Sequence, residues 1–177
     1  MTSTEEISKF NFHDYIKDEK SLTFLVGAGC SVLAPSNLPN ARDFIKSIIE
    51  SAIIKSEVDK ILSLENLTLE QLLRIIYSII DENSNLIDFF SKCDKPNLEH
   101  FFLAEMITNG SYVITTNFDH LIELALLALE VPRKKIVPVI TQKDYEKYMD
   151  PEKLFESGRM AVYKIHGSSN NLITSEN

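Results

Sequence analysis

Cysteine pairs, an excess of basic residues and long apolar runs are all missing from this 177-residue chain. Its two cysteines, Cys30 and Cys93, do not form pairs with metal-ligand spacing, which argues against a structural zinc site. Acidic residues outnumber basic ones by 26 to 18, and a net charge of −8 disfavours nucleic acid as a partner. No apolar run is long enough to span a bilayer, so we expect no membrane partner.

Several catalytic signatures are missing as well. The glycine turn at residues 27–31 lacks the third glycine of the dehydrogenase dinucleotide fingerprint, and no Gly-Lys-Ser/Thr of a P-loop follows it. The chain also lacks the Gly-x-Ser-x-Gly nucleophile elbow. Residues 1–20 are charged and polar throughout and show no secretory signal pattern, so we expect a cytoplasmic protein.

The chain does contain alternating strand and helix patterns. Its length and its 44% share of hydrophobic residues indicate one globular domain or most of one. Short apolar runs predict four strands, at Leu22–Val26, Tyr112–Thr115, Ile136–Ile140 and Ala161–Ile165. The first is expected to be buried, and Pro138 makes the third an edge strand or an irregular piece. We therefore predict an α/β, Rossmann-like fold with a mainly parallel sheet and helices on both faces.

Helical periodicity and capping residues predict the helices. They are expected at 4–20, after an N-cap at Asn40, after a capping box at Thr68–Gln71, at 86–90, at 96–109 with a stop at Gly110, at 121–129 and at 141–149. Between the first two strands every predicted element is a helix, so we predict a helical insertion at about residues 55–109. The helix at 121–129 is apolar almost all round, which suggests that something outside the chain covers it.

Polar and small residues follow three of the four predicted strands. They are Gly27, Ala28, Gly29 and Ser31 after the first strand, Thr116, Asn117 and Asp119 after the second, and His166, Gly167 and Ser168 after the fourth. Glycine permits positive φ and lets a ligand approach the backbone. Because the exits of parallel strands lie at one edge of a sheet, we expect these residues to form a nucleotide site.

Each of these residues also has a plain structural interpretation, which stays open at this point. Asn117 and Asp119 suit helix caps, and Ser31 suits either a cap or a phosphate donor. Cys30 fits a small packing residue better than an activated thiol, since no base lies beside it in the sequence.

His166 differs from the other histidines because it lies between an apolar strand and a glycine turn. An imidazole in such a place suits a general base near neutral pH. The remaining histidines fall in expected helices, and we interpret them as surface or packing residues: His13, His100 and His120.

Taken together, these stretches resemble the sirtuin superfamily over about residues 21–170. Gly27–Ser31 is similar to the family's Gly-Ala-Gly-x-Ser, and Thr115–Asp119 is similar to its Thr-Gln-Asn-Ile-Asp. Lys164–Ser168 resembles the segment that holds the family's catalytic histidine. The order of the motifs and the helical insertion agree with the family as well.

The departures from the family pattern point to one branch of it. Deacylase sirtuins carry a four-cysteine zinc module after the His-Gly segment, and this chain has no cysteine there. Residues 38–44 match the family's Gly-Ile-Pro-Asp-Phe-Arg segment only in part, and Thr116 replaces its glutamine. The chain looks more like the zinc-free bacterial branch associated with NAD hydrolysis and anti-phage defence. The family's later adenosine-binding turns are not reached by residue 177, so we expect the N-terminal portion of a longer protein.

The resemblance implies roles for the strand-exit residues. NAD would be a substrate, no metal would be needed, and Asn117 and His166 would be catalytic. The remaining strand-exit residues would bind NAD: Gly27, Ala28, Gly29, Ser31, Thr116, Asp119, Gly167 and Ser168. Two alternatives stay open, an NAD-dependent protein deacylase or ADP-ribosyltransferase, and a non-catalytic module that senses NAD or ADP-ribose. Self-association or a regulatory activator is a further expectation.

Overall fold

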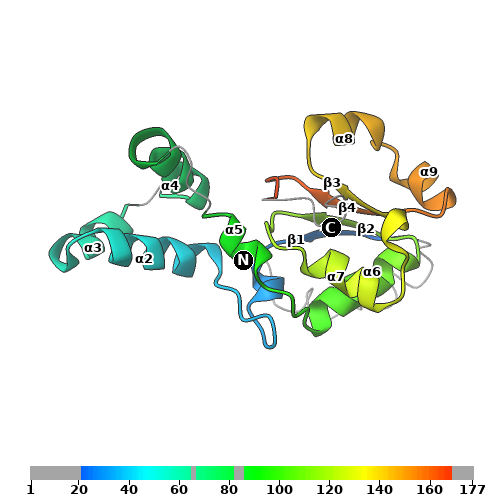
Figure 1. Cartoon of the computed structure of the whole chain (residues 1–177), viewed down its shortest axis with the longest axis horizontal. Coiled ribbons are helices and arrows are strands. Elements are labelled where there is room, and N and C mark those ends of the chain that lie inside the picture. Colours follow the sequence, from blue (N-terminus) through cyan, green and yellow to red (C-terminus); the bar gives the residue numbers. More distant parts are fainter. Residues whose placement is uncertain (1–20, 65–66, 82–85, 169–177) are drawn as a thin grey trace, which may run out of the picture.

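A computed structural model describes residues 21–64, 67–81 and 86–168, so the helix expected at 4–20 lies outside the described residues. At its centre is a four-stranded parallel sheet with the order β1-β2-β4-β3 (Figure 1). The strands are β1 (Thr23–Val26), β2 (Tyr112–Thr115), β3 (Ile136–Val139) and β4 (Met160–Lys164). The predicted α/β fold class is confirmed.

Helices cover both faces of the sheet, as Figure 1 shows. One face carries α6 (Leu98–Thr108) and α7 (Leu121–Ala128), and the other carries α8 (Gln142–Lys147) and α9 (Pro151–Glu156). Each face has its own apolar core. Val113, Val162 and Ala125 are fully buried on the α6–α7 side, and Leu154 and Tyr163 pack on the α8–α9 side. A short 3₁₀ turn, η4 (Arg133–Lys135), precedes β3.

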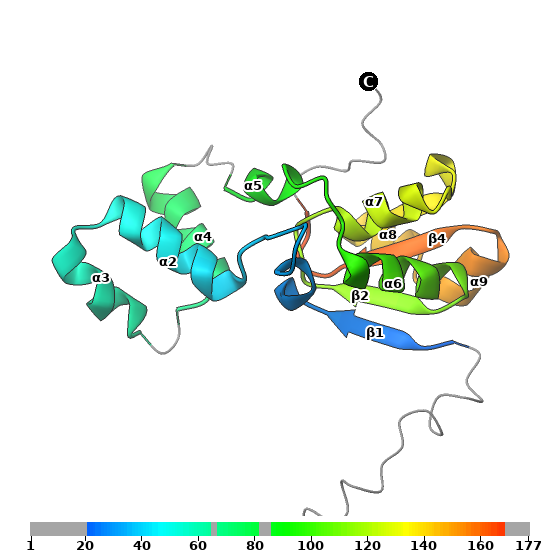
Figure 2. The same ribbon diagram turned by 90° about the horizontal axis from the view of Figure 1, so that it is seen from below.

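The insertion between β1 and β2 is helical, and most of it forms a lobe beside the exits of the strands (Figure 2). The lobe contains α2 (Ala41–Ala52), α3 (Lys55–Leu62), α4 (Leu69–Ile75), the π-helical turn η3 (Ile76–Ile80) and α5 (Asp88–Ser91). Its core continues into the sheet domain through Phe118 and Leu121. The Phe90 ring packs on Phe118 and on Phe44. This shared core fixes the lobe against the strand exits.

The chain enters and leaves the lobe through two segments that lie side by side. The Ser36 hydroxyl in the entering segment donates to the Lys95 carbonyl in the leaving segment over 2.7 Å. Asn97 Nδ2 donates to the carbonyls of Cys30 and Leu33, at 2.8 and 3.2 Å. The Asn97 side chain also caps α6 by accepting from the Glu99 and His100 amides, so one residue ties the helix start to the turn after β1.

Several predicted elements need correction. β1 was expected to be buried, but it is an edge strand in which Leu25 is 71% exposed, because the helices of the second face lie over β3 and β4. The helix predicted after Thr68 is an α-helix only as far as Ile75, and Ile79 and Ile80 beyond it are exposed. The helix widens into the π turn η3 there, which changes the direction of the side chains. The edge position predicted for the strand with Pro138 is confirmed.

The apolar helix α7 does not need a cover from outside the chain. Ile122 and Leu126 are buried against α6 and the sheet, and Leu121 is buried in the core shared with the lobe. The capping predictions at Asn40 and Thr68 are confirmed by hydrogen bonds from Asp43 N and Gln71 N. Within the described part of the chain, no helix is both long enough and apolar enough to cross a membrane.

Candidate functional site

The exits of β1, β2 and β4 meet at one edge of the sheet. Hydrogen bonding continues beyond the strands: the Thr116 amide donates to the Val26 carbonyl at 3.1 Å, and the Ile165 amide donates to the Thr115 carbonyl at 3.0 Å. The three polar segments are therefore held beside one another, as the parallel arrangement predicts.

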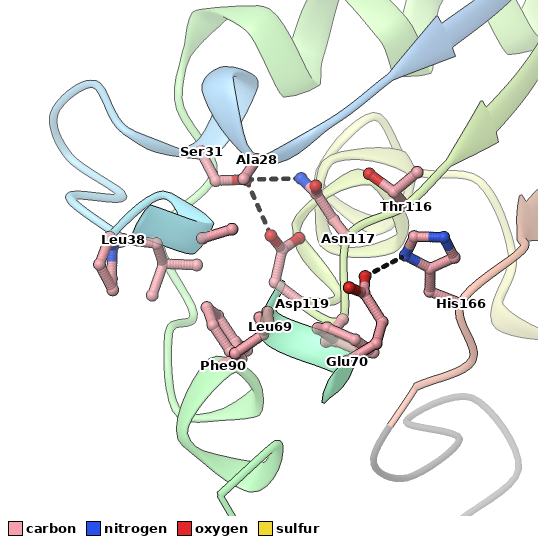
Figure 3. Close-up of a pocket in the computed structure, with 13 residues that line it drawn as sticks. Ala28, Ser31, Leu38, Leu69, Glu70, Phe90, Thr116, Asn117, Asp119 and His166 are labelled. Carbon is pink, nitrogen blue, oxygen red and sulfur yellow. Dashed lines mark hydrogen bonds and ion pairs between the residues drawn. The ribbon is translucent and has the colours of Figure 1, made fainter. Parts of the chain in front are cut away.

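A pocket of about 100 Å³ lies between these exits and the helical lobe (Figure 3). Its polar wall comes from the sheet side and includes Ser31, Thr116, Asn117, Asp119 and His166. Its other wall comes from the lobe and the segment leading to it, and includes Leu38, Leu69, Glu70 and Phe90. A neighbouring groove of about 440 Å³ shares Glu70, Phe118 and His166 with this pocket.

The glycine turn forms the 3₁₀ turn η2 (Ala28–Ser31). Neither of its glycines has the positive φ that the sequence suggested; Gly27 is extended, with φ at −129°. Gly27 is needed for close approach instead, because a Cβ there would lie 3.2 Å from Thr116 Oγ1. A Cβ at Gly29 would meet no described atom within 4 Å, so the turn is open on that side.

Ser31 is the centre of a buried hydrogen-bond network. Its hydroxyl donates to Asp119 Oδ2 over 2.8 Å and accepts from Asn117 Nδ2 over 3.1 Å (Figure 3). The other oxygen of Asp119 accepts from the Leu121 amide at 3.1 Å, at the start of α7. Asp119 thus bonds the first amide of α7 although the N-cap residue is His120, which has no side-chain cap, and the same carboxylate also lines the pocket.

Asn117 is 6% exposed, and its carboxamide orientation is fixed by two acceptors. Nδ2 donates to Ser31 Oγ and also to Cys30 Sγ, the latter at 3.3 Å. Oδ1 is buried and has no hydrogen-bond partner among the described residues. A buried acceptor without a donor is costly, and here it belongs to a residue that lines a pocket. The arrangement suits a ligand or a water that brings an O–H or N–H group.

Cys30 is half-buried beside this network. Burial raises the pKa of its thiol, with the Asp119 carboxylate adding to the effect. The thiol form is therefore favoured, which fits the packing role better than that of an activated nucleophile.

His166 lies at the pocket mouth and is paired with the helical lobe. Its Nδ1 is 3.3 Å from Glu70 Oε1, and both side chains are partly exposed. The pKa of Glu70 lies below its usual value, chiefly because its own backbone amide donates to it and also because His166 is near. Glu70 carried no signal in the sequence beyond its place in a capping-box segment.

Four of the predicted binding residues do not line the pocket. Gly27 and Gly29 flank Ala28 in the turn, and Gly167, with φ at +83°, and Ser168 follow His166 in the chain. Ser168 Oγ donates to the Phe118 carbonyl at 3.0 Å and so ties the last strand exit to the second one. The other predicted residues, Ala28, Ser31, Thr116, Asn117, Asp119 and His166, do line it.

His100 is a site neighbour that the sequence interpretation missed. It is fully buried, and its Nε2 lies 3.1 Å from Ser31 Oγ. The interpretation as a packing residue overlooked the signal of an Asn at the N-cap followed three residues later by a polar side chain. His13 lies outside the described residues.

A buried charge pair supports the site from behind. Lys164 and Glu123 are each 1% exposed, with Nζ and Oε1 3.3 Å apart, and the Lys164 ammonium also donates to the Asp119 carbonyl. Burial would raise the pKa of Glu123, but the nearby Lys164 and His120 outweigh it and lower this pKa. His120 is likewise buried, with its Nδ1 3.9 Å from Glu123. The sequence signal for this pair is a single charged residue in an otherwise apolar helix, Glu123, and another at the end of an apolar strand, Lys164.

Metal ligands do not gather at the site. Among the residues that the structure describes, no group of three or more His, Cys, Asp or Glu side chains is placed to hold a metal ion. The expectation that no metal takes part stays a prediction.

Comparison with known families gives one match. Residues 111–177, less than half of the chain, match the model of a family described as a SIR2-like domain. The matched stretch contains the β2 and β4 exits, with Asn117, Asp119 and His166, and begins after the glycine turn. A search of curated proteins finds no match. The family match supports the sirtuin-like resemblance for this part of the chain.

Proposed function

We propose that the protein is a sirtuin-like NAD hydrolase, which cleaves the bond between nicotinamide and ribose to give nicotinamide and ADP-ribose. The observation that supports this most directly is the unpartnered Oδ1 of Asn117 on a residue that lines the pocket between the strand exits. The SIR2-like match over the segment that holds Asn117 and His166 points to the same chemistry.

The lining of the pocket suits the nicotinamide end of NAD. Its volume of about 100 Å³ is below the roughly 150 Å³ of a cavity that accommodates benzene, so part of a nicotinamide ring would lie outside the pocket as it stands. Leu38, Leu69 and Phe90 supply apolar contacts for such a ring. The open side of Gly29 leaves the backbone accessible to a phosphate, and the first amides of a 3₁₀ turn have no acceptor within the turn. The rest of the substrate would extend out of the pocket.

Cleavage of the nicotinamide–ribose bond develops positive charge on the ribose, so catalysis depends mostly on position and electrostatics. Both oxygens of Asp119 accept hydrogen bonds, and a carboxylate retains further lone pairs for the nicotinamide amide. Its charge also favours the developing cation. Asn117 Oδ1 would accept from the attacking water or from a ribose hydroxyl and orient it.

His166 would act as the general base that takes a proton from the water or a ribose hydroxyl. General base catalysis typically contributes roughly 10²–10⁴-fold in rate. Glu70 engages Nδ1 of this ring, which fixes the ring and leaves Nε2 for proton transfer. Water then attacks the ribose carbon and the nicotinamide leaves as a neutral base.

The test is nicotinamide release from NAD by the purified protein, measured by liquid chromatography. Asn117→Ala and His166→Ala should each abolish release while the circular dichroism spectrum and the melting temperature are retained. Asn109→Ala, at an exposed asparagine whose side chain bonds within its own helix, is the matched control and should behave as wild type.

The products separate this proposal from its alternatives. Free ADP-ribose without any peptide supports hydrolysis. O-acetyl-ADP-ribose formed only with an acetylated peptide would favour a deacylase. Binding of NAD in calorimetry without nicotinamide release would favour a sensor, and wild-type release by His166→Ala would reject the assigned base.

A further inference from the structure

The buried ring of His100 stands behind the pocket wall, one residue layer away from the pocket. It lies in the first turn of α6 and is fully buried, so it does not line the pocket itself. It joins the N-terminus of α6 to Ser31, which contacts two pocket residues directly.

The hydrogen bonds around this ring define its tautomer. The Asn97 backbone amide donates to Nδ1 of His100 over 3.1 Å, so Nδ1 carries no proton. Burial lowers the pKa of His100, which favours the neutral ring. A neutral imidazole without a proton on Nδ1 carries it on Nε2, and that N–H points to Ser31 Oγ at 3.1 Å.

The direction of the next bonds follows. The Ser31 hydroxyl gives its one proton to Asp119, so its oxygen can only accept from other neighbours. The donors are His100 Nε2–H and Asn117 Nδ2–H. If the Asn117 carboxamide were flipped, its oxygen would face the lone pairs of Ser31. The network therefore orients the amide nitrogen inward and leaves Oδ1 as the free acceptor.

We propose that His100 is a positioning residue for the site: through Ser31 it holds the carboxamide of Asn117 in the single orientation that presents Oδ1 for a ligand. The proposal rests on the function proposed above for its effect on turnover. The hydrogen-bond directions do not depend on that function. The rigid His100 ring donates a hydrogen bond from Nε2 to Ser31 Oγ, which an apolar side chain of equal volume cannot do.

The first test observes the tautomer directly. In long-range ¹H–¹⁵N spectra of labelled wild-type protein near neutral pH, the His100 ring should show a protonated Nε2 and an unprotonated Nδ1. Ser31→Ala should speed the exchange of the Asn117 side-chain amide protons with solvent. A protonated Nδ1, or a mixture of tautomers, overturns the proposal whether or not the protein acts on NAD.

The second test uses two variants of matched size. His100→Leu fills the space but donates nothing, whereas His100→Gln can place an N–H donor near the position of Nε2. We expect His100→Leu to lower kcat for nicotinamide release by about 10²-fold with little change in KM, as for a misplaced catalytic group. His100→Gln should recover much of this loss. Equal kcat losses in the two variants, at equal melting temperatures, would overturn the proposal.

The outcomes keep the two proposals apart. If wild-type protein binds NAD without releasing nicotinamide, the hydrolase function fails, and the position of Asn117 is then judged by the tautomer, the amide exchange and NAD affinity in the same variants. If wild-type protein is active and His100→Leu retains full kcat, the hydrolase function stands and the positioning role of His100 is rejected.

Discussion

At the residue scale, the two glycines of the turn after β1 have different reasons to be glycine. Gly27 lies against Thr116, where a Cβ would be 3.2 Å from Oγ1, so the Thr116 side chain would have to shift by a few tenths of an ångström to accept it. Gly29 has open space where its Cβ would be, so no packing constraint excludes a side chain there. What Gly29 leaves free is access to the backbone.

This difference predicts opposite outcomes for two alanine substitutions. Gly29→Ala should leave the free energy of unfolding nearly unchanged and weaken NAD binding, because the added methyl group occupies the approach to the turn. Gly27→Ala should destabilise the fold by about 1–3 kcal/mol, the range for an added group in a packed position. Urea unfolding and calorimetry with NAD measure both effects. If Gly29→Ala bound NAD with wild-type affinity, the backbone of this turn would not be part of the NAD-binding surface.

The neutral state of His100 also predicts how stability depends on pH. Its folded-state pKa lies below the ordinary value of 6.5, so the unfolded chain binds the proton more readily. The stabilisation is therefore complete above pH 6.5 and is lost as the pH falls through the folded-state pKa, with a slope of at most about 1.4 kcal/mol per pH unit.

Unfolding in urea at a series of pH values checks this dependence. His100→Gln cannot titrate, and it should lack this part of the slope. Lys46→Ala, at an exposed position on α2, should retain it. An unchanged slope in His100→Gln would show that other groups cause the dependence.

At the element scale, the pairing of Lys164 in β4 with Glu123 in α7 connects a strand, a helix and the loop that carries Asp119. Breaking a buried ion pair by removing one partner typically costs about 3–5 kcal/mol, because the other charge stays buried. Replacing both partners by apolar residues is often neutral or stabilising.

We therefore expect Lys164→Met and Glu123→Leu each to destabilise the protein by about 3–5 kcal/mol, and the double variant to recover most of this loss. Nicotinamide release should not recover with stability, since the Asp119 carbonyl loses its donor in the double variant. Chemical unfolding and the activity assay together give the answer. Additive losses in the double variant would contradict a coupled pair.

Elements with a local signal were predicted well. The capping box at Thr68 and the N-cap at Asn40 depend on nearby residues alone, and both are present. The helix α9 was missed although Asp150 and Pro151 give the ordinary N-cap and first-turn signal. By contrast, the edge position of β1 depends on where the distant helices α8 and α9 pack, which local periodicity does not encode.

The candidate site divides in the same way. The residues at strand exits could be predicted because parallel topology alone brings Ser31, Asn117 and His166 together. The contributions of His100 and Glu70 could not, since each depends on how a helix of the insertion is placed against the sheet. The sequence predicts which residues follow the strands, but it does not predict which helix packs against those residues.

At the scale of the whole molecule, the ion pair of Glu70 with His166 links the lobe to the sheet at the pocket mouth. Because both side chains are partly exposed, Glu70→Gln should change the free energy of unfolding by less than about 1 kcal/mol. It should nevertheless lower kcat/KM for nicotinamide release, because the His166 ring loses its partner.

Ionic strength gives a second readout of this pair. High salt should screen the wild-type pair and bring its kcat/KM toward the value of Glu70→Gln, which should itself respond less. Glu50→Gln, which removes an exposed carboxylate from α2, is the control and should follow wild type. The same salt response in wild type and Glu70→Gln would show that the pair does not influence the site.

The paired segments that carry the chain into and out of the lobe have a mechanical consequence. Ser36 with Lys95, and Asn97 with Leu33, bind the two passes into a single neck. The lobe is therefore held at two places, at this neck and at the core where Phe90 packs on Phe118. The separation of Glu70 from His166 at the pocket mouth thus depends on contacts that lie outside the pocket.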